Sequence, residues 1–244
     1  MKKLIRIAMW SGPRNLSTAL MRSFENREDC FVSDEPLYGS FLKRTGISHP
    51  MYDQVIQSME CDYSKVVRGL SEKKIEEKTI WYQKHMCHHI LDEDDISWSL
   101  NLTNCFLIRQ PKDMLRSYMK RRETFSIEEL GLKKQLDIFN YIKSKSGNIP
   151  PVIEVNQLLL NPEIYLKKLC KIIEIPFSKK MLKWDKGSRK TDGVWGDHWY
   201  ANVKQSTGFI SNKKFNADQK LPKEMEKMLN HLMPVYNKLA EYQI

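Results

Sequence analysis

The chain has 244 residues, of which 41% are hydrophobic and 29% are charged. This length and balance allow a substantial core, and aromatic and aliphatic residues occur along the whole chain, which excludes a long disordered protein. The formal net charge is +10 and the isoelectric point is about 9.2. Such an excess of positive charge favours an anionic partner, such as a nucleic acid, an acidic lipid or a phosphorylated small molecule.

The five cysteines are odd in number, widely spaced and free of Cys-x-x-Cys pairs. This pattern argues against a disulfide framework and a structural zinc site, and it favours reduced thiols in a cytoplasmic protein. The basic start of the chain is followed by only a short apolar run, which predicts a strand rather than a signal peptide. No run approaches the roughly 20 apolar residues of a membrane helix, so no transmembrane segment is expected.

Five short apolar runs have the length and composition of strands that are buried on both faces. They are Leu4–Met9, Cys30–Ser33, Ile80–Gln83, Cys105–Ile108 and Val152–Val155. Helical patterns separate most of these runs, and such alternation predicts a parallel sheet with helices on both faces. The expected fold class is therefore α/β, with residues 1–244 forming a single P-loop NTPase-like three-layer domain around a central parallel sheet of about five strands.

The first predicted strand leads into a loop that has the features of an anion site. Its residues are Ser11, Gly12, Pro13, Arg14, Asn15, Leu16, Ser17 and Thr18. A helix is predicted over 16–26, and a helix N-terminus binds phosphate or sulfate through unpaired N–H groups and partial positive charge. Gly12 permits close approach of the backbone, and Arg14 offers paired donors to an oxyanion. The Walker A pattern GxxxxGK[ST] is absent, and the alternative is that Ser17 only caps a helix while Arg14 is a surface charge.

Polar residues follow the second and third predicted strands. Glu35 comes shortly after the second strand, and Lys84 and His85 come directly after the third. Because parallel strands present their carboxyl ends at one edge of the sheet, we expect these side chains to face one cleft. For the histidines between 85 and 89, a zinc site and core packing are the alternatives. For Glu35, the alternative is a helix-capping carboxylate.

The fourth predicted strand ends at a second basic, hydroxyl-bearing segment. Arg109 lies at the strand end, Pro111 and Asp113 predict the start of a helix, and Ser117 lies about two turns into it. Arg109 is therefore expected on the same rim of the sheet as Arg14. Two such loops suit a ligand with two separated phosphates. The alternative is that Arg109 pairs with Asp113 and only braces the turn.

The last part of the chain contains two predicted helices and a segment without clear periodicity. Asn161-Pro162 signals the start of a helix over 162–173, and an amphipathic helix is predicted over 223–242. Segment 183–212 is rich in Gly, Trp, Asp and Lys. Long segments of this kind are functional or disordered, and its tryptophans favour an ordered, functional region.

These motifs resemble the sulfotransferase superfamily that uses 3′-phosphoadenosine 5′-phosphosulfate (PAPS). The family's PKSGTT-type loop, which grips the 5′-phosphosulfate, is similar to residues 11–18, with Arg14 in the place of the usual Lys. Its RxPxDxxxS element, which grips the 3′-phosphate, is similar to the segment from Arg109 to Ser117 with the spacing intact. The likeness covers roughly residues 4–210, and it is closest to bacterial-type members with WSGPRN and KHMxHH segments.

Two later stretches resemble the same family. Residues 155–177 are similar to its late strand–helix unit. Residues 188–199 are similar to its C-terminal RKG-type loop, with the glycine three residues after Lys190, and the resemblance implies that segment 183–212 closes over the nucleotide and the acceptor. The resemblance implies that residues 11–18, Arg109, Ser117, Arg189 and Lys190 hold PAPS as a co-substrate, without a metal.

The implied reaction transfers a sulfuryl group from PAPS to a hydroxyl or amine of a small-molecule or carbohydrate acceptor. Arg14 and the helix N–H groups are expected to neutralise charge on the bridging oxygen, and Lys84 to assist the leaving phosphate. A general base should take the acceptor's proton, and the sequence leaves Glu35 and His85 as the two candidates. Candidates for the acceptor pocket are His49, His198, Trp199 and Tyr200.

Two other functions stay open at this point. A P-loop small-molecule kinase needs a metal ligand and a Lys beside the loop hydroxyl, and neither is clear in the sequence. A non-enzymatic module that binds RNA or anionic polymers needs one continuous basic face with stacking aromatics. The enzyme is the preferred reading, with no stable nucleic-acid partner. The sequence leaves the oligomeric state open, a homodimer being one option.

Overall fold

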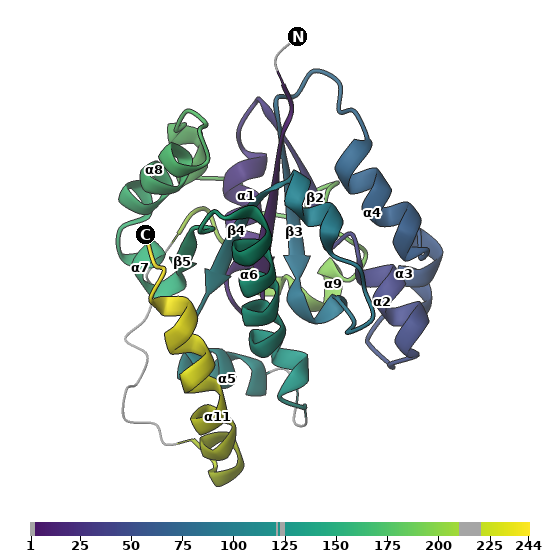
Figure 1. The fold of residues 1–244 in the computed structure, drawn as a ribbon, viewed down its shortest axis with the longest axis vertical. Helices are drawn as coiled ribbons and strands as arrows, with labels where there is room; N and C mark the ends of the chain where they lie inside the picture. Colours follow the sequence, from purple (N-terminus) through teal and green to yellow (C-terminus); the bar gives the residue numbers. More distant parts are fainter. Residues whose placement is uncertain (1–2, 121, 123–124, 210–220) are drawn as a thin grey trace.

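The computed structural model describes residues 3–120, 122, 125–209 and 221–244. Its centre is a five-stranded parallel sheet in the order β2-β3-β1-β4-β5, with helices on both faces (Figure 1). The strands are β1 (Ile5–Ser11), β2 (Cys30–Asp34), β3 (Ile80–Met86), β4 (Thr103–Ile108) and β5 (Val152–Glu154). The predicted α/β class and its central parallel sheet are confirmed, and each strand overlaps the apolar run that predicted it.

The helices alternate with the strands along most of the chain. They are α1 (Ser17–Glu25), α2 (Tyr38–Thr45), α3 (Tyr52–Ser58), α4 (Tyr63–Glu72), α5 (Pro111–Met119), α6 (Leu132–Ser146), α7 (Val155–Leu160), α8 (Pro162–Ile172), α9 (Gly196–Trp199), α10 (Ala201–Lys204) and α11 (Lys223–Ala240). Among the described residues, no helix is long and apolar enough to cross a membrane. The last three residues of the predicted 183–212 segment lie outside the described residues.

Two apolar cores cover the two faces of the sheet. On one face, Trp10 and Phe106 pack in a core with α5, α6 and α11. On the other face, Met9 and Leu107 pack with α1, α7 and α8. Neighbouring residues of one strand therefore enter different cores, as the alternation of side chains along a strand requires. This double burial is why the strands appear in the sequence as continuous apolar runs.

A third, smaller cluster lies beyond the carboxyl ends of β2 and β3. Tyr38 and Phe41 of α2 and Val55 of α3 pack there with Trp195 and Tyr200. The segment around α9 is thus brought next to residues that follow β2, although more than a hundred residues separate them in the chain.

The strand order creates a crevice at the carboxyl end of β1. The chain leaves β1 toward β2 on one side of the sheet and leaves β4 toward β5 on the other, and ligands of open α/β sheets bind where such connections diverge. Two buried amides hold the strand ends together at this point. Asn15 Nδ2 donates to the Leu107 carbonyl at 3.3 Å, and Gln135 Nε2 donates to the carbonyls of Trp10 and Leu107 at 2.9 and 3.0 Å.

Strand β3 continues three residues beyond its predicted end at Gln83. Its pairing with β1 extends through His85 and Met86. The added residues include Lys84 and His85, which are each only 1% exposed, so their polarity concealed a buried strand. Because successive side chains of a strand point to opposite faces, the longer strand separates Lys84 from His85.

Candidate functional site

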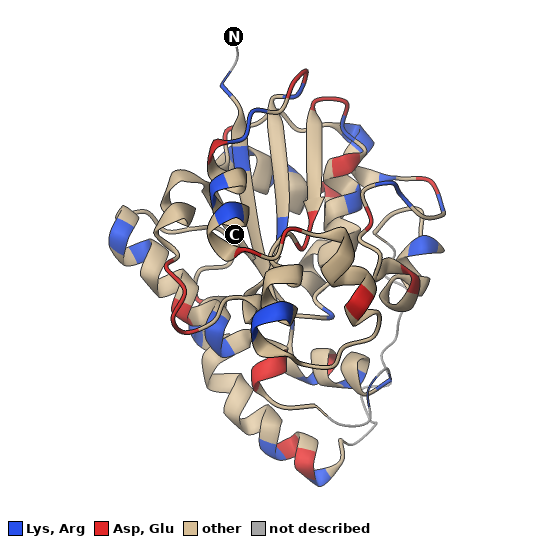
Figure 2. Ribbon diagram, turned by 90° about the vertical axis from the view of Figure 1, so that its right-hand side faces the viewer, with Lys and Arg blue, Asp and Glu red and all other residues tan. Residues whose placement is uncertain are grey.

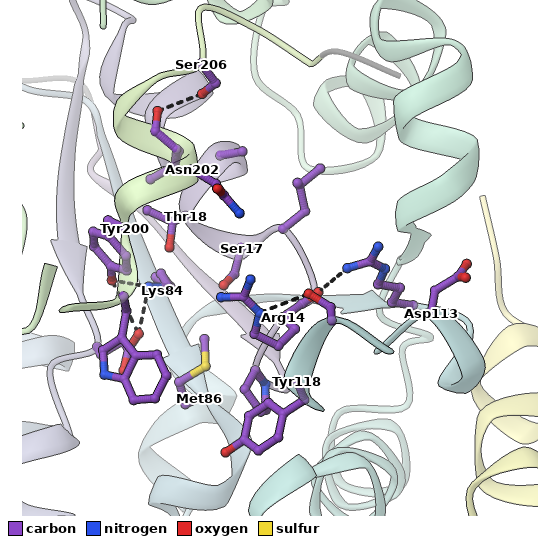
Figure 3. A pocket seen from close by; sticks show the side chains of 18 of the residues that line it. Arg14, Ser17, Thr18, Lys84, Met86, Asp113, Tyr118, Tyr200, Asn202 and Ser206 are labelled. Carbon is purple, nitrogen blue, oxygen red and sulfur yellow. Dashed lines mark hydrogen bonds and ion pairs between the residues drawn. The ribbon is translucent and has the colours of Figure 1, made fainter. Parts of the chain in front are cut away.

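A cavity of about 870 Å³ lies at the carboxyl ends of the strands. Its walls come from the loop after β1, the start of α1, the ends of β2 and β3, helix α5, and the segment around α9 and α10 (Figure 3). These are the loops that the crevice of the sheet brings together, and the cavity has a basic end and an acidic end.

The loop between β1 and α1 has an unusual backbone. Arg14 and Leu16 both have φ of 63°, whereas Asn15 between them does not. Left-handed conformations are uncommon for residues with a Cβ and concentrate at functional sites. Loops that alternate in this way direct successive N–H groups to one side and form an anion-binding concavity. The loop residues that line the cavity are Pro13, Arg14, Leu16, Ser17 and Thr18.

Three residues of the predicted loop motif, Ser11, Gly12 and Asn15, contact the protein's own backbone rather than the cavity. Ser11 is fully buried, and its Oγ donates to the His85 carbonyl at 3.5 Å. Asn15 holds the end of β4, as described above. A Cβ on Gly12 would lie 2.4 Å from the carbonyl oxygen of Leu130, so only glycine fits against the turn before α6. The close approach that Gly12 permits is therefore with the protein's own backbone.

The two predicted anion loops meet at the basic end of the cavity. Arg109 Nη1 donates to the main-chain carbonyl of Arg14 at 2.7 Å, and Arg14 Nε donates to Ser117 Oγ at 3.1 Å. All three side chains line the cavity. Burial lowers the pKa of Arg109, but an arginine stays charged at neutral pH. The N-termini of α1 and α5 add partial positive charge at the same place.

Asp113 lies beside this junction in the first turn of α5. It accepts a hydrogen bond from Asn156 Nδ2 at 3.2 Å, and both residues line the cavity. Arg109 thus links the loop after β4 to the loop after β1, a role wider than bracing its own turn. Asn156 was not among the predicted site residues, because its position at the start of α7 carries no distinctive sequence signal.

The acidic end of the cavity is a buried charge cluster centred on Lys84. Lys84 Nζ donates to Asp34 Oδ1 at 2.8 Å, to Glu35 Oε1 at 2.7 Å and to the Tyr200 hydroxyl at 2.6 Å. Burial disfavours the ammonium form, but the two carboxylates outweigh it and hold the pKa of Lys84 above its usual range. Burial also raises the pKa of Glu35; Lys84 opposes this rise and Asp34 adds to it. Glu35 is therefore a stronger proton acceptor than an ordinary glutamate.

The Tyr200 hydroxyl fastens the α9 segment to this cluster. It donates to Asp34 Oδ2 at 2.7 Å and accepts from Trp195 Nε1 at 3.0 Å. The backbone N–H of Gly193 donates to the same Asp34 oxygen at 3.2 Å. Tyr200 was predicted only as a residue lining the acceptor pocket, and Asp34 was not predicted as a site residue. The hydrogen-bond network joins residues that are far apart in the chain, and no sequence pattern indicates that residues 34, 84 and 200 meet.

The structure does not bring His85 to the cavity. Its ring stacks on Trp10 with centroids 4.6 Å apart, on the α6 side of the sheet, and Nε2 lies 3.2 Å from Gln83 Oε1. Burial lowers the pKa of His85 to about 3. His88 and His89, in the 3₁₀ turn after β3, do line the cavity. Within the described residues, no three His, Cys, Asp or Glu side chains form a metal-binding group.

Arg189 and Lys190 also lie away from the cavity lining. The Arg189 N–H donates to Asp192 Oδ2 at 2.9 Å, and Arg189 Nε lies 3.7 Å from a carboxylate oxygen of Glu25. The fully buried Arg22 of α1 binds Asp192 at 2.6 Å. This part of the RKG-like segment is therefore fastened to the end of α1. The following residues line the cavity: Trp195, Trp199, Tyr200, Asn202, Val203, Ser206, Gly208 and Phe209.

Comparisons with known sequences identify the same family over nearly the whole chain. Residues 5–242 match the family model described as a sulfotransferase domain. Two curated relatives from Arabidopsis thaliana are Branched-chain-amino-acid aminotransferase-like protein 2, 37% identical over 239 residues, and protein 1, 39% identical over 240. The alignments cover 95% and 97% of this chain but only 40% and 42% of those proteins. The chain thus spans about two fifths of their length.

Solved structures share the fold at low sequence identity. The sulfotransferase domain from the curacin biosynthetic pathway has a TM-score of 0.55 and 14% identity, covering 96% of this chain and 99% of that one. The sulfotransferase domain of the Synechococcus PCC 7002 olefin synthase has a TM-score of 0.59 and 16% identity, with 96% of each chain covered. A sulfotransferase from Alicyclobacillus acidocaldarius has a TM-score of 0.51 and 11% identity, covering 97% of this chain and 94% of that one. At such identities the likeness shows the fold alone, whereas the match over residues 5–242 shows that this chain belongs to the sulfotransferase domain family.

Proposed function

We propose that the protein transfers a sulfuryl group from PAPS to a hydroxyl or amine of a small-molecule or carbohydrate acceptor. The observation that carries this proposal is the junction of the two anion loops, where Arg109 donates to the Arg14 carbonyl and Arg14 donates to Ser117. Two separate cationic groups at one end of a single cavity suit a nucleotide with phosphates at both its 5′ and 3′ positions. Family membership supports the reaction class.

In this proposal the basic end of the cavity holds the donor. Arg14, Ser17, Thr18 and the N-terminus of α1 bind the 5′-phosphosulfate, while Arg109 and Ser117 bind the 3′-phosphate. The bond between sulfur and the bridging oxygen breaks, and its electron pair leaves with the 5′-phosphate. Positive charge already in place at the start of the reaction stabilises that developing charge.

The acidic end would supply the base. Glu35 lines the cavity, and burial raises its pKa, which makes it the better proton acceptor of the two candidates. His85 is buried on the opposite face of β3, which leaves Glu35 as the proposed base. The three N–H donors of Lys84 are taken by Asp34, Glu35 and Tyr200, so Lys84 is proposed to position Glu35 rather than to assist departure of the phosphate, the role expected from the sequence.

A calorimetric titration with adenosine 3′,5′-bisphosphate in the absence of magnesium tests the donor. Saturable binding with one nucleotide per chain is expected, and Arg109→Ala should weaken it. Binding of ATP only with magnesium, with no binding of the bisphosphate, would favour a phosphotransferase and reject the proposal.

The charge distribution gives less support to a polymer-binding module. Figure 2 shows basic and acidic residues interspersed over the elements seen from that side, without one continuous basic face there. A steep salt-dependent affinity for any oligonucleotide that is unchanged by Arg14→Ala and Arg109→Ala would restore that alternative.

A further inference from the structure

The acidic end of the cavity is walled mainly by aromatic and imidazole rings. The His89 ring lies between two aromatic rings, with its centroid 4.7 Å from that of Tyr38, nearly parallel to it, and 4.9 Å from that of Phe41. Tyr38 in turn meets Trp195 edge-on at 5.1 Å, and its hydroxyl lies 2.9 Å from His49 Nδ1. We call the part of the cavity lined by Glu35, Tyr38, His49, His88, His89 and Trp195 the ring-walled end.

The ring-walled end offers little unpaired positive charge to an anion, because Arg122, whose charge reaches Tyr38 and His49, is bound to Glu129 at 2.6 Å. Four cations line the described cavity, and two of them, Arg14 and Arg109, belong to the basic end. The Lys84 ammonium is already bound by Asp34, Glu35 and Tyr200, and Lys120 is exposed beyond the end of α5. Burial lowers the pKa of His88 to about 3 and that of His89 well below its ordinary value, so both rings are neutral.

Glu35 and His89 leave a gap of defined size between them. His89 Nε2 lies 3.9 Å from Glu35 Oε2, which is too far for a direct hydrogen bond. An oxygen about 2.9 Å from both atoms would fit between them and complete two hydrogen bonds. Glu35 Oε1 already accepts from Lys84, whereas His89 Nδ1 has no hydrogen-bond partner in the described structure. Stacking holds the His89 ring in place. Nδ1 is buried, and Nε2 is the ring nitrogen on the side of Glu35, so Nε2 is the atom that can meet a ligand in the cavity.

We propose that the acceptor is a small neutral alcohol or phenol whose hydroxyl lies between Glu35 Oε2 and His89 Nε2. This inference rests on the proposed function and assigns His89 as an acceptor-binding residue. With its proton on Nε2, His89 donates to the acceptor oxygen, and the acceptor O–H donates to Glu35. During transfer the proton passes to the Glu35 carboxylate and the oxygen bonds to sulfur. The bond from sulfur to the bridging oxygen breaks, and its electron pair leaves with the 5′-phosphate.

The same geometry disfavours charged acceptors. A carboxylate on the acceptor would be placed against the net negative charge of Asp34, Glu35 and Lys84, which like-charge repulsion opposes. A protonated amine has no lone pair with which to attack sulfur. A neutral hydroxyl needs neither a counter-charge nor a prior deprotonation.

Three acceptors that share one benzyl ring test this class: benzyl alcohol, 4-(hydroxymethyl)benzoate and benzylamine, each supplied with PAPS. Sulfated product is measured by mass spectrometry. We expect kcat/KM for benzyl alcohol to exceed the other two at least about tenfold, the effect of one favourable charge-assisted contact. His89→Phe keeps the stacked ring but removes the donor, so the KM for benzyl alcohol should rise about tenfold or more. His89→Gln keeps a donor and should recover part of this loss.

The matched control is His231→Gln, because His231 is exposed on α11, away from the cavity lining. It should leave both kinetic constants unchanged. Product from none of the three acceptors, a preference for the benzoate or the amine, or an unchanged KM in His89→Phe would overturn the proposal. Calorimetry of the unmodified protein with adenosine 3′,5′-bisphosphate distinguishes failure of this proposal from failure of the proposed function. If the nucleotide binds, the donor assignment stands whatever the acceptor results are. If it does not bind, the proposed function is rejected as well.

Discussion

At the scale of single residues, the acidic end behaves as one coupled group. Lys84 is 1% exposed, and its charge is compensated by Asp34 and Glu35. A buried charge is tolerated only when it is paired and hydrogen-bonded, so each member of the cluster depends on the others. Substitutions here must therefore preserve shape and hydrogen bonding if they are to report on chemistry rather than on folding.

Glu35→Gln satisfies that condition and tests the proposed base. The amide oxygen can still accept from Lys84, but the side chain no longer takes a proton at neutral pH. We expect turnover to fall about 10²–10⁴-fold, the usual contribution of general base catalysis. The affinity for adenosine 3′,5′-bisphosphate, measured by calorimetry, should stay within about twofold because the nucleotide loops are untouched.

The dependence of turnover on pH also tests whether Glu35 is the base. Glu35 accepts a proton only when ionised, so turnover should fall as the pH drops through its pKa. Because burial raises that pKa, the acid limb of kcat should lie above the ordinary glutamate value of about 4.3. Glu35→Gln should abolish this limb. If His85→Gln abolished it instead while Glu35→Gln kept near-normal turnover, the assignment of the base would be wrong.

At the scale of elements, the sequence predicts what depends on local pattern. The five strands follow from apolar runs, since β1, β3, β4 and β5 are buried on both faces and the edge strand β2 buries Cys30 and Val32 on one. The spacing from Arg109 to Ser117 is also enough to predict that both side chains lie at one end of the cavity, because the end of a strand and the first turns of a helix fix their positions. The partner of Arg109, the Arg14 carbonyl, was not predictable, since it requires the left-handed backbone of the first loop.

Other predictions depended on information that a sequence does not carry locally. The face on which His85 lies follows from the true end of β3, which two buried polar residues conceal. Arg189 and Lys190 were predicted to bind nucleotide because their segment resembles the family's C-terminal loop. In the structure, the ion pair between Asp192 and Arg22 holds this segment against the end of α1 instead. Long-range pairs of this kind are set by tertiary packing, which local patterns do not report.

The junction of the two loops predicts different roles for its arginines. Arg14→Ala should lower turnover strongly, because Arg14 is proposed to contact the transferring group. Arg109→Ala should chiefly weaken the affinity for adenosine 3′,5′-bisphosphate, about 10–100-fold for a lost charged hydrogen bond of 1.5–3 kcal/mol. Calorimetry and initial rates with saturating PAPS separate the two effects. Equal small effects of both substitutions would contradict this division.

At the scale of the whole molecule, the site draws on elements from almost the full chain. Cavity residues extend from Pro13 to Phe209, and the C-terminal helix α11 packs in the same core as α5 and α6. The curated relatives are more than twice as long, and the described residues of this chain form a five-stranded sheet with helices on both faces. This arrangement leads us to propose that the described sheet and its helices unfold as a single cooperative unit whose stability rises when nucleotide binds.

Thermal unfolding of the isolated chain tests that proposal. One transition is expected, and adenosine 3′,5′-bisphosphate at a hundred times its Kd should stabilise the folded state by about 2.7 kcal/mol. For a chain of this size each kcal/mol raises Tm by about 2–4 °C, so the whole transition should shift by about 5–11 °C. Arg109→Ala at the same ligand concentration should lose most of the shift, because its weaker binding lowers the ratio of ligand to Kd. Two separate transitions, of which only one responds to the nucleotide, would show that the chain is divided and that part of it lies outside the binding unit.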